Sequence, residues 1–158
     1  MHAESRFRFA ALYGRRRVGK TALISEFRKG KDCIFHVATE QNDRAALESF
    51  SRDVLRVLPA ARSMLYVLPS WEKGFEYIAD QAGHRRMIVA VDEYPYLASA
   101  NKSISSVLQK IIDTRLMNTN LFLTLCGSSM SVMEIQSSTQ LCEPALRSPH
   151  GSAQSGAI

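Results

Sequence analysis

Continuous apolar runs alternate along the chain with stripes of apolar residues at helical spacing. The runs predict buried strands at residues 7–13, 33–39, 87–91 and 120–126. The stripes predict helices over residues 22–27, 44–58, 70–82 and 103–117. Strands that alternate with helices in this way predict an α/β fold with a parallel sheet and right-handed crossovers.

Local signals mark the ends of the predicted helices. Gly30 is a stop for the first helix, and Asn42 or Asp43 is expected to cap the second, which Pro59 ends. The third helix carries Trp71 at its start, followed by apolar residues every three or four positions. We therefore expect Trp71 to lie in the core.

The first predicted strand leads into a complete phosphate-binding loop. Residues 14–21 read Gly-Arg-Arg-Arg-Val-Gly-Lys-Thr, which matches G-x-x-x-x-G-K-[ST]. In such a loop successive backbone N–H groups surround the phosphates, and the following helix adds the positive end of its dipole. The pattern predicts that Lys20 bridges the outer phosphates and that Thr21 ligates Mg²⁺. The nucleotide-binding residues expected on this basis are Gly14, Arg15, Arg16, Arg17, Val18, Gly19, Lys20, Thr21 and Ala22.

Two carboxylates, Asp92 and Glu93, follow the apolar run at 87–91. An acidic strand end on its own is more often an ordinary turn. Here the carboxyl ends of parallel strands meet at one edge of a sheet, so the acidic pair is expected beside the phosphate loop. This arrangement, the Walker B pattern, predicts that Asp92 holds Mg²⁺ and that Glu93 activates or orients the attacking water.

The last predicted strand also ends in polar residues, Gly127, Ser128 and Ser129. If this strand lies between the other two, its tip reaches the γ-phosphate, and Ser128 or Ser129 is a candidate sensor. A simple turn of small residues is equally consistent with the sequence. Neither serine fits a hydrolase nucleophile, because the segment is not G-x-S-x-G and no histidine is placed as a base.

Composition fits one globular domain with a substantial core, since 46% of the 158 residues are hydrophobic and 22% are charged. No apolar run approaches the roughly 20 residues that span a bilayer. The N-terminus has no apolar signal segment, so a cytoplasmic location is expected. Cys33, Cys126 and Cys142 are odd in number and widely spaced, which argues against disulfides and zinc. The four histidines show no metal-binding spacing.

The net charge of +5 is unevenly distributed, because residues 1–31 contain nine Lys or Arg and two Glu. A positive field around the phosphate loop attracts a polyanionic ligand. Nucleic acid stays open as a partner but has no support, because basic and aromatic residues are not interleaved. A solvated surface is the simpler interpretation of residues 15–17.

With these motifs in place, the chain resembles the archaeal-type ATPase family within the AAA+/STAND group of P-loop NTPases. The stretches that carry the likeness are 12–23, 37–40, 70–72, 91–97, 106–109 and 125–129, within a match over residues 7–134. The resemblance implies a three-layer fold with a mostly parallel sheet of about four strands in the order 1-4-3-2. It also implies ATP and Mg²⁺ as ligands, with Lys20, Glu93 and Ser128 as catalytic residues and Thr21 and Asp92 on the metal.

Members of that family usually have a segment ahead of the first strand, and beyond the sensor a further strand, a helical lid and often a nuclease-like domain. We therefore expect residues 1–136 to form an incomplete ATPase core and residues 137–158 to form a weakly ordered tail. The lid and a neighbouring subunit normally supply arginines that stabilise the transition state. Without these arginines, we expect this chain alone to hydrolyse ATP slowly or not detectably.

Two functions remain open at this point. The first is Mg-dependent ATP hydrolysis. The second is a nucleotide-gated interaction or signalling module, in which ATP recruits a protein partner or a second copy without turnover. A phosphotransferase is disfavoured, because the adjacent carboxylates suit the activation of water and no acceptor pocket is evident.

Overall fold

The fold is built on one parallel sheet. The computed structural model describes residues 7–13, 19–59 and 67–127. In this part of the chain four strands pair in the order β1-β4-β3-β2, and every pair of neighbours is parallel. The strands are β1 (Arg8–Tyr13), β2 (Cys33–Val37), β3 (Met87–Asp92) and β4 (Leu121–Gly127). The predicted fold class and strand order are confirmed, including the insertion of β4 between β1 and β3.

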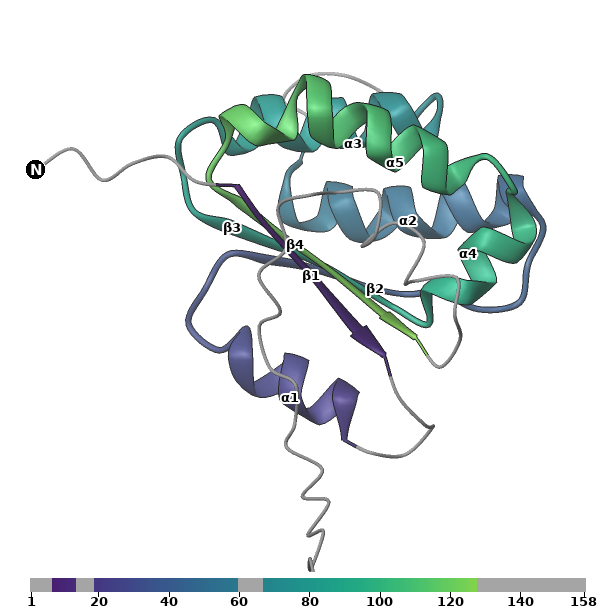
Figure 1. Cartoon of the computed structure of the whole chain (residues 1–158), viewed down its shortest axis with the longest axis horizontal. Helices are drawn as coiled ribbons and strands as arrows, with labels where there is room; N and C mark the ends of the chain where they lie inside the picture. The colour runs from purple at the N-terminus through teal and green to yellow at the C-terminus, as the bar shows by residue number, and fades with distance from the viewer. Residues whose placement is uncertain (1–6, 14–18, 60–66, 128–158) are drawn as a thin grey trace, which may run out of the picture.

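Helices cover both faces of this sheet, which makes three layers (Figure 1). One helix, α1 (Lys20–Phe27), lies on one face. The opposite face carries α2 (Asp43–Val57), α3 (Trp71–Ala82), α4 (Tyr94–Ala100) and α5 (Ile104–Thr114). A short 3₁₀ turn, Leu116–Asn118, leads into β4.

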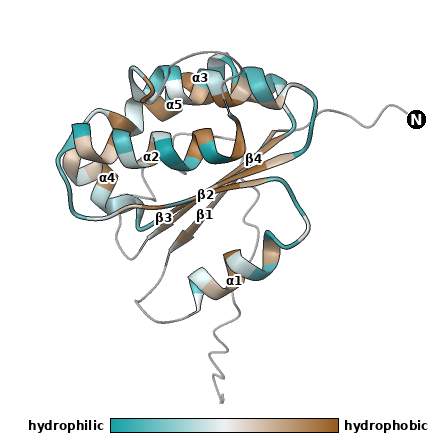
Figure 2. Ribbon diagram, turned by 180° about the vertical axis from the view of Figure 1, so that it is seen from behind, coloured by the Kyte–Doolittle hydropathy of each residue, from teal (hydrophilic) through white to brown (hydrophobic). Residues whose placement is uncertain are grey.

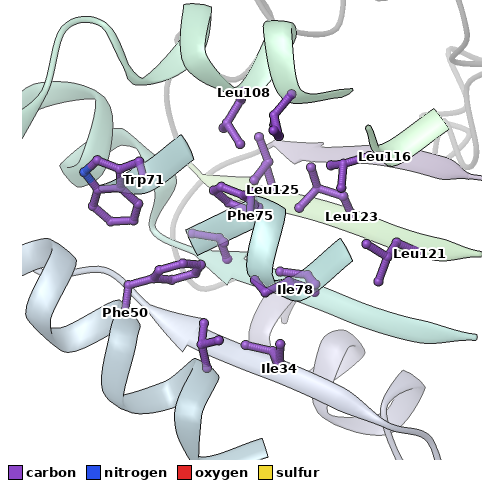
Figure 3. Close-up of a cluster of buried hydrophobic side chains, with 14 of the residues drawn as sticks. Ile34, Phe50, Trp71, Phe75, Ile78, Leu108, Leu116, Leu121, Leu123 and Leu125 are labelled. Carbon is purple, nitrogen blue, oxygen red and sulfur yellow. The ribbon is translucent and has the colours of Figure 1, made fainter. Parts of the chain in front are cut away.

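The main core lies between the sheet and the four helices on one face. Strand residues alternate between the two faces of the sheet, and on β3 Met87, Val89 and Val91 join this core. Figure 3 shows the aromatic part of the cluster, where the ring of Phe50 lies 5.1 Å from that of Trp71. The indole Nε1–H of Trp71 donates to Asp43 Oδ1 at 2.8 Å. The expected burial of Trp71 is confirmed, and the polar edge of its ring has a partner.

A smaller cluster fills the space between α1 and the sheet. Its buried members are Ile24, Ile88, Ala90 and Cys126. The colouring of Figure 2 shows apolar residues concentrated on the strands. Of the apolar stripe expected on the first helix only Ile24 packs fully inward, because the side chains of Leu23 and Phe27 are 52% and 45% exposed.

Several boundaries differ from those expected. The expectation of one continuous helix over 103–117 is wrong, because α5 ends at Thr114 and a separate 3₁₀ turn follows. Strand β2 ends at Val37, two residues early. The expected capping of α2 by Asn42 is confirmed, since its side chain accepts from Ala45 N at 2.9 Å. The seven-residue helix α4 was not predicted at all.

No helix in the described ranges combines the length and apolar character that a membrane span requires. The predicted tail, residues 137–158, lies outside the described residues.

Candidate functional site

The site lies where β3 ends and α1 begins. Gly19 precedes α1 with a φ of +80°, in the left-handed region that favours glycine, and Lys20 is the first helical residue. The rest of the predicted phosphate loop falls outside the described residues, as does the predicted sensor. These residues are Gly14, Arg15, Arg16, Arg17, Val18 and Ser128. The described part of the site therefore consists of the start of α1 and the carboxyl end of β3.

Thr21 and Asp92 meet at this edge. The hydroxyl of Thr21 donates a hydrogen bond of 2.6 Å to Asp92 Oδ2. Alternation along β3 explains the contact, because Ile88 and Ala90 face α1 and Asp92 continues the same register. The structure thus brings together Thr21 and Asp92, the two residues that the sequence motifs predicted as ligands of Mg²⁺.

Asp92 is held firmly from several directions. It is 4% exposed, and its second carboxylate oxygen, Oδ1, accepts from the backbone N–H of Glu93 at 2.9 Å. Its carbonyl oxygen accepts from Ala38 N, also at 2.9 Å. A buried carboxylate with hydrogen bonds on both oxygens has little freedom to turn, so its position is set before any ligand arrives.

Glu93 occupies an unusual backbone conformation. Its φ of 54° and ψ of 37° are left-handed, and it is the only residue other than glycine with a positive φ in the described ranges. It is also the N-cap of α4, and its carbonyl accepts from Tyr96 N at 3.0 Å. Strained residues of this kind are concentrated at functional sites, where the surrounding structure holds them in place.

Cys126 lies beside the acidic pair, at the carboxyl end of β4. It is fully buried, and burial, reinforced by the negative charge of Asp92, raises the pKa of its thiol to about 12. The charges of Lys20 and Glu93 also act on this thiol, in opposite directions. Residues from α1, β3 and β4 therefore converge on one small region, with an uncharged thiol next to the carboxylates.

The donor set suits a small, hard cation. Mg²⁺ prefers oxygen ligands, and proteins usually hold it through one or two side chains while water and phosphate oxygens complete the shell. Thr21 Oγ1 and Asp92 Oδ2 provide two such oxygens at one point. The residues present therefore fit a magnesium ion that is shared with a phosphate group.

Comparison with known proteins identifies the family to which the chain belongs. A family described as an ATPase domain found predominantly in Archaea matches residues 1–143. The chain belongs to this archaeal-type P-loop ATPase family. The assignment agrees with the resemblance that the sequence motifs suggested.

Two curated relatives come from Methanocaldococcus jannaschii. The uncharacterized protein MJECL04 is 34% identical over 127 residues, which are 80% of this chain and 26% of the relative. The uncharacterized protein MJ0424 is 40% identical over 55 residues, 35% of this chain and 53% of the relative. The chain therefore spans about a quarter and about a half of the length of these two relatives.

Solved structures with the same fold are more distant in sequence. The Walker-type ATPase PABY2304 of Pyrococcus abyssi superposes with a TM-score of 0.59 at 18% identity, over 80% of this chain and 42% of that one. Cdc6p of Pyrobaculum aerophilum superposes with a TM-score of 0.55 at 17% identity, over 82% of this chain and 35% of Cdc6p. The ORC1 protein of Aeropyrum pernix, solved in complex with DNA, superposes with a TM-score of 0.53 at 18% identity. The match covers 83% of this chain and 37% of ORC1. At these identities the likeness shows the fold alone.

Sequence reasoning did not find two features of this region. It did not place Cys126 on the same face of the sheet as Asp92, where the alternation along β4 puts it. It also gave no sign of the left-handed backbone of Glu93, because glutamate rarely adopts that conformation. Both features depend on how elements distant in the sequence pack together, which the motifs do not show.

Proposed function

We propose that this chain binds Mg-ATP at the edge where β3 ends and α1 begins, and that it hydrolyses the bound ATP. The hydrogen bond between Thr21 and Asp92 is the observation that supports this most directly. It unites the last residue of the phosphate-loop motif with the first acidic residue of the Walker B pattern. Membership of an ATPase family agrees with a nucleotide as the ligand.

Each residue has a definite role in this proposal. The N–H groups of residues 14–22 surround the phosphates, and Lys20 contributes a positive charge to the outer ones. Thr21 and Asp92 hold the metal ion, which neutralises charge on the phosphates when it is bound. Glu93 accepts a proton from the attacking water or orients it, and Ser128 contacts the γ-phosphate.

We expect hydrolysis by the chain alone to be slow. Many ATPases of this class receive a transition-state arginine from a neighbouring subunit or another domain, and such an arginine accelerates turnover on the order of 10³ to 10⁵-fold. Because this chain spans only part of its curated relatives, a slow rate is compatible with the proposed site.

Phosphate release from a Glu93→Gln variant tests the proposal. The amide keeps the size of the side chain but is not a base, so turnover should fall by at least about 100-fold. The affinity for ATP should stay within about twofold of the parent, because the proposed phosphate contacts come from residues 14–22 and Ser128 and not from Glu93. Glu48→Gln is the matched control, since Glu48 lies on α2 and its side chain pairs with Arg44.

The same assay distinguishes the second candidate function. A parent chain that binds Mg-ATP and associates with a partner only when ATP is present, but releases no phosphate, is a nucleotide-gated interaction module. Equal phosphate release from the parent and from Glu93→Gln contradicts the catalytic role of Glu93.

A further inference from the structure

The strained backbone of Glu93 needs a physical explanation. Its left-handed conformation is unfavourable for a residue with a Cβ atom, and such conformations persist only where neighbouring residues enforce them. We propose that Tyr94 is a positioning residue for Glu93, acting through the hydrogen bond between its hydroxyl and Ser105. This inference rests on the catalytic role proposed for Glu93.

Both neighbours of Glu93 are fixed in the protein interior. On one side Asp92 is 4% exposed, and its carboxylate and its carbonyl are both hydrogen-bonded. On the other side Tyr94 has no exposed surface and belongs to the main core. Glu93 therefore links two buried residues that their contacts hold in place. It cannot relax to a more favourable conformation unless one of them moves.

The hydroxyl of Tyr94 ties the start of α4 to α5. It lies 2.9 Å from Ser105 Oγ, in the first turn of α5. Two ion pairs on the surface join α5 and its C-cap residue to α3, Lys110 with Glu72 and Arg115 with Asp80. Tyr94 is therefore anchored to a helix that is itself held by the core and by its neighbour. Loss of this hydrogen bond removes one of the contacts that hold the start of α4, and we expect the backbone of Glu93 to open more often as a result.

The phosphate-binding residues should not be affected by this loss. Lys20 and Thr21 lie on α1, which covers the opposite face of the sheet (Figure 1). A change at Tyr94 should therefore lower the rate of turnover and leave the affinity for ATP almost unchanged. If the Tyr94 hydroxyl served stability alone, its loss would not lower the turnover rate while leaving the affinity for ATP unchanged.

Tyr77 provides a matched control for the loss of one tyrosine hydroxyl. Its hydroxyl donates to the carbonyl of Leu58 at 2.8 Å and joins α3 to the end of α2. Tyr77→Phe and Tyr94→Phe remove the same chemical group, and each breaks a hydrogen bond between two helices. Only Tyr94 is adjacent to the acidic pair.

The experiment compares Tyr94→Phe, Ser105→Ala, the double variant and Tyr77→Phe. Hydrogen exchange of the Glu93 amide, followed by NMR, reports directly on the backbone, because this N–H donates to Asp92 Oδ1 in the left-handed conformation. We expect exchange to be about fivefold faster in Tyr94→Phe and in Ser105→Ala, the change that one lost hydrogen bond produces. The double variant should be no faster than either single variant, and Tyr77→Phe should match the parent.

Turnover provides the second readout. The kcat of Tyr94→Phe should fall about fivefold while the Kd for ATP changes by less than about twofold. Unchanged exchange of the Glu93 amide in Tyr94→Phe overturns the inference, whether or not the parent hydrolyses ATP. An unchanged kcat in Tyr94→Phe also overturns it. Faster exchange together with a parent that shows no turnover supports the positioning role and rejects the proposed hydrolysis.

Discussion

Thr21 and Asp92 are 71 positions apart in the sequence, and their side chains share a hydrogen bond of 2.6 Å. The bond connects the first turn of α1 to the last residue of β3 across the edge of the sheet. Two hard oxygen atoms are thereby fixed at one point, where we propose that the metal ion binds. This geometry underlies the proposal of a Mg-ATP site.

A Thr21→Val variant tests the contribution of the hydroxyl to metal binding. Valine has nearly the same shape but no oxygen, and Thr21 is exposed, so the change leaves no cavity in the core, although Asp92 Oδ2 loses its hydrogen bond. We expect the Mg²⁺ concentration that half-saturates ATP binding to rise at least about tenfold, because one metal ligand is lost. Thr21→Ser keeps the oxygen and should remain close to the parent. Equal Mg²⁺ dependence of Thr21→Val and the parent contradicts a metal-binding role.

The pair of buried His36 and partly exposed Asp53 should contribute to stability. His36 is 1% exposed, its Nδ1 lies 2.7 Å from Asp53 Oδ2, and its Nε2 has no partner in the structure described here. Asp53→Ala leaves the other ring nitrogen unsatisfied as well, which should cost about 1–3 kcal/mol in the free energy of unfolding. Urea denaturation measures this difference.

Arg56→Ala is the control for that experiment, because Arg56 pairs with the same carboxylate, at 3.5 Å, but its side chain is 76% exposed. A surface ion pair of this kind contributes at most about 1 kcal/mol. Losses of stability that are equal in the two variants would show that the buried histidine does not depend on Asp53.

Cys126 should resist alkylation in the folded protein. Burial and the charge of Asp92 raise the pKa of its thiol from 9.0 to about 12, and the thiolate is the reactive form. Iodoacetamide at pH 8 should leave Cys126 unlabelled in the folded chain and label it fully in guanidinium, as read by mass spectrometry of the peptides. Rapid labelling of folded Cys126 would contradict its buried position.

The same shift has a consequence for stability at high pH. The folded state binds the thiol proton more tightly than the unfolded state, so the contribution of Cys126 to stability is complete below pH 9.0. It is lost as the pH rises from there towards about 12. A Cys126→Ala variant should therefore show a smaller fall in thermal stability over this range than the parent.

The architecture was largely predictable from the sequence because its signals are local. Continuous apolar runs predicted all four strands. Apolar residues spaced three or four positions apart predicted four of the five α-helices. Helix α4 has only seven residues and contains Pro95 in its first turn, so its sequence shows no helical periodicity. Its buried residues are Tyr94 and Leu97. Tertiary packing, rather than local sequence, determines such a short helix.

The site was only partly predictable. The spacing of the motifs indicated that Lys20, Thr21, Asp92 and Glu93 belong to one edge of a sheet. Their mutual geometry depends on how α1 packs, and the exposure of Leu23 and Phe27 shows that its apolar pattern did not fix that packing. The backbone strain at Glu93 likewise arises from contacts between elements distant in the sequence.

Calorimetric titration of Mg-ATP into the parent and a Lys20→Ala variant tests the central claim most directly. Lys29→Ala is the matched control, since Lys29 follows the same helix and its side chain pairs with Glu26 in solvent. We predict that Lys20→Ala weakens binding at least about tenfold, the effect of removing a charged contact to phosphate, and that Lys29→Ala binds like the parent. A Lys20→Ala protein that binds Mg-ATP as tightly as the parent would contradict the proposed site.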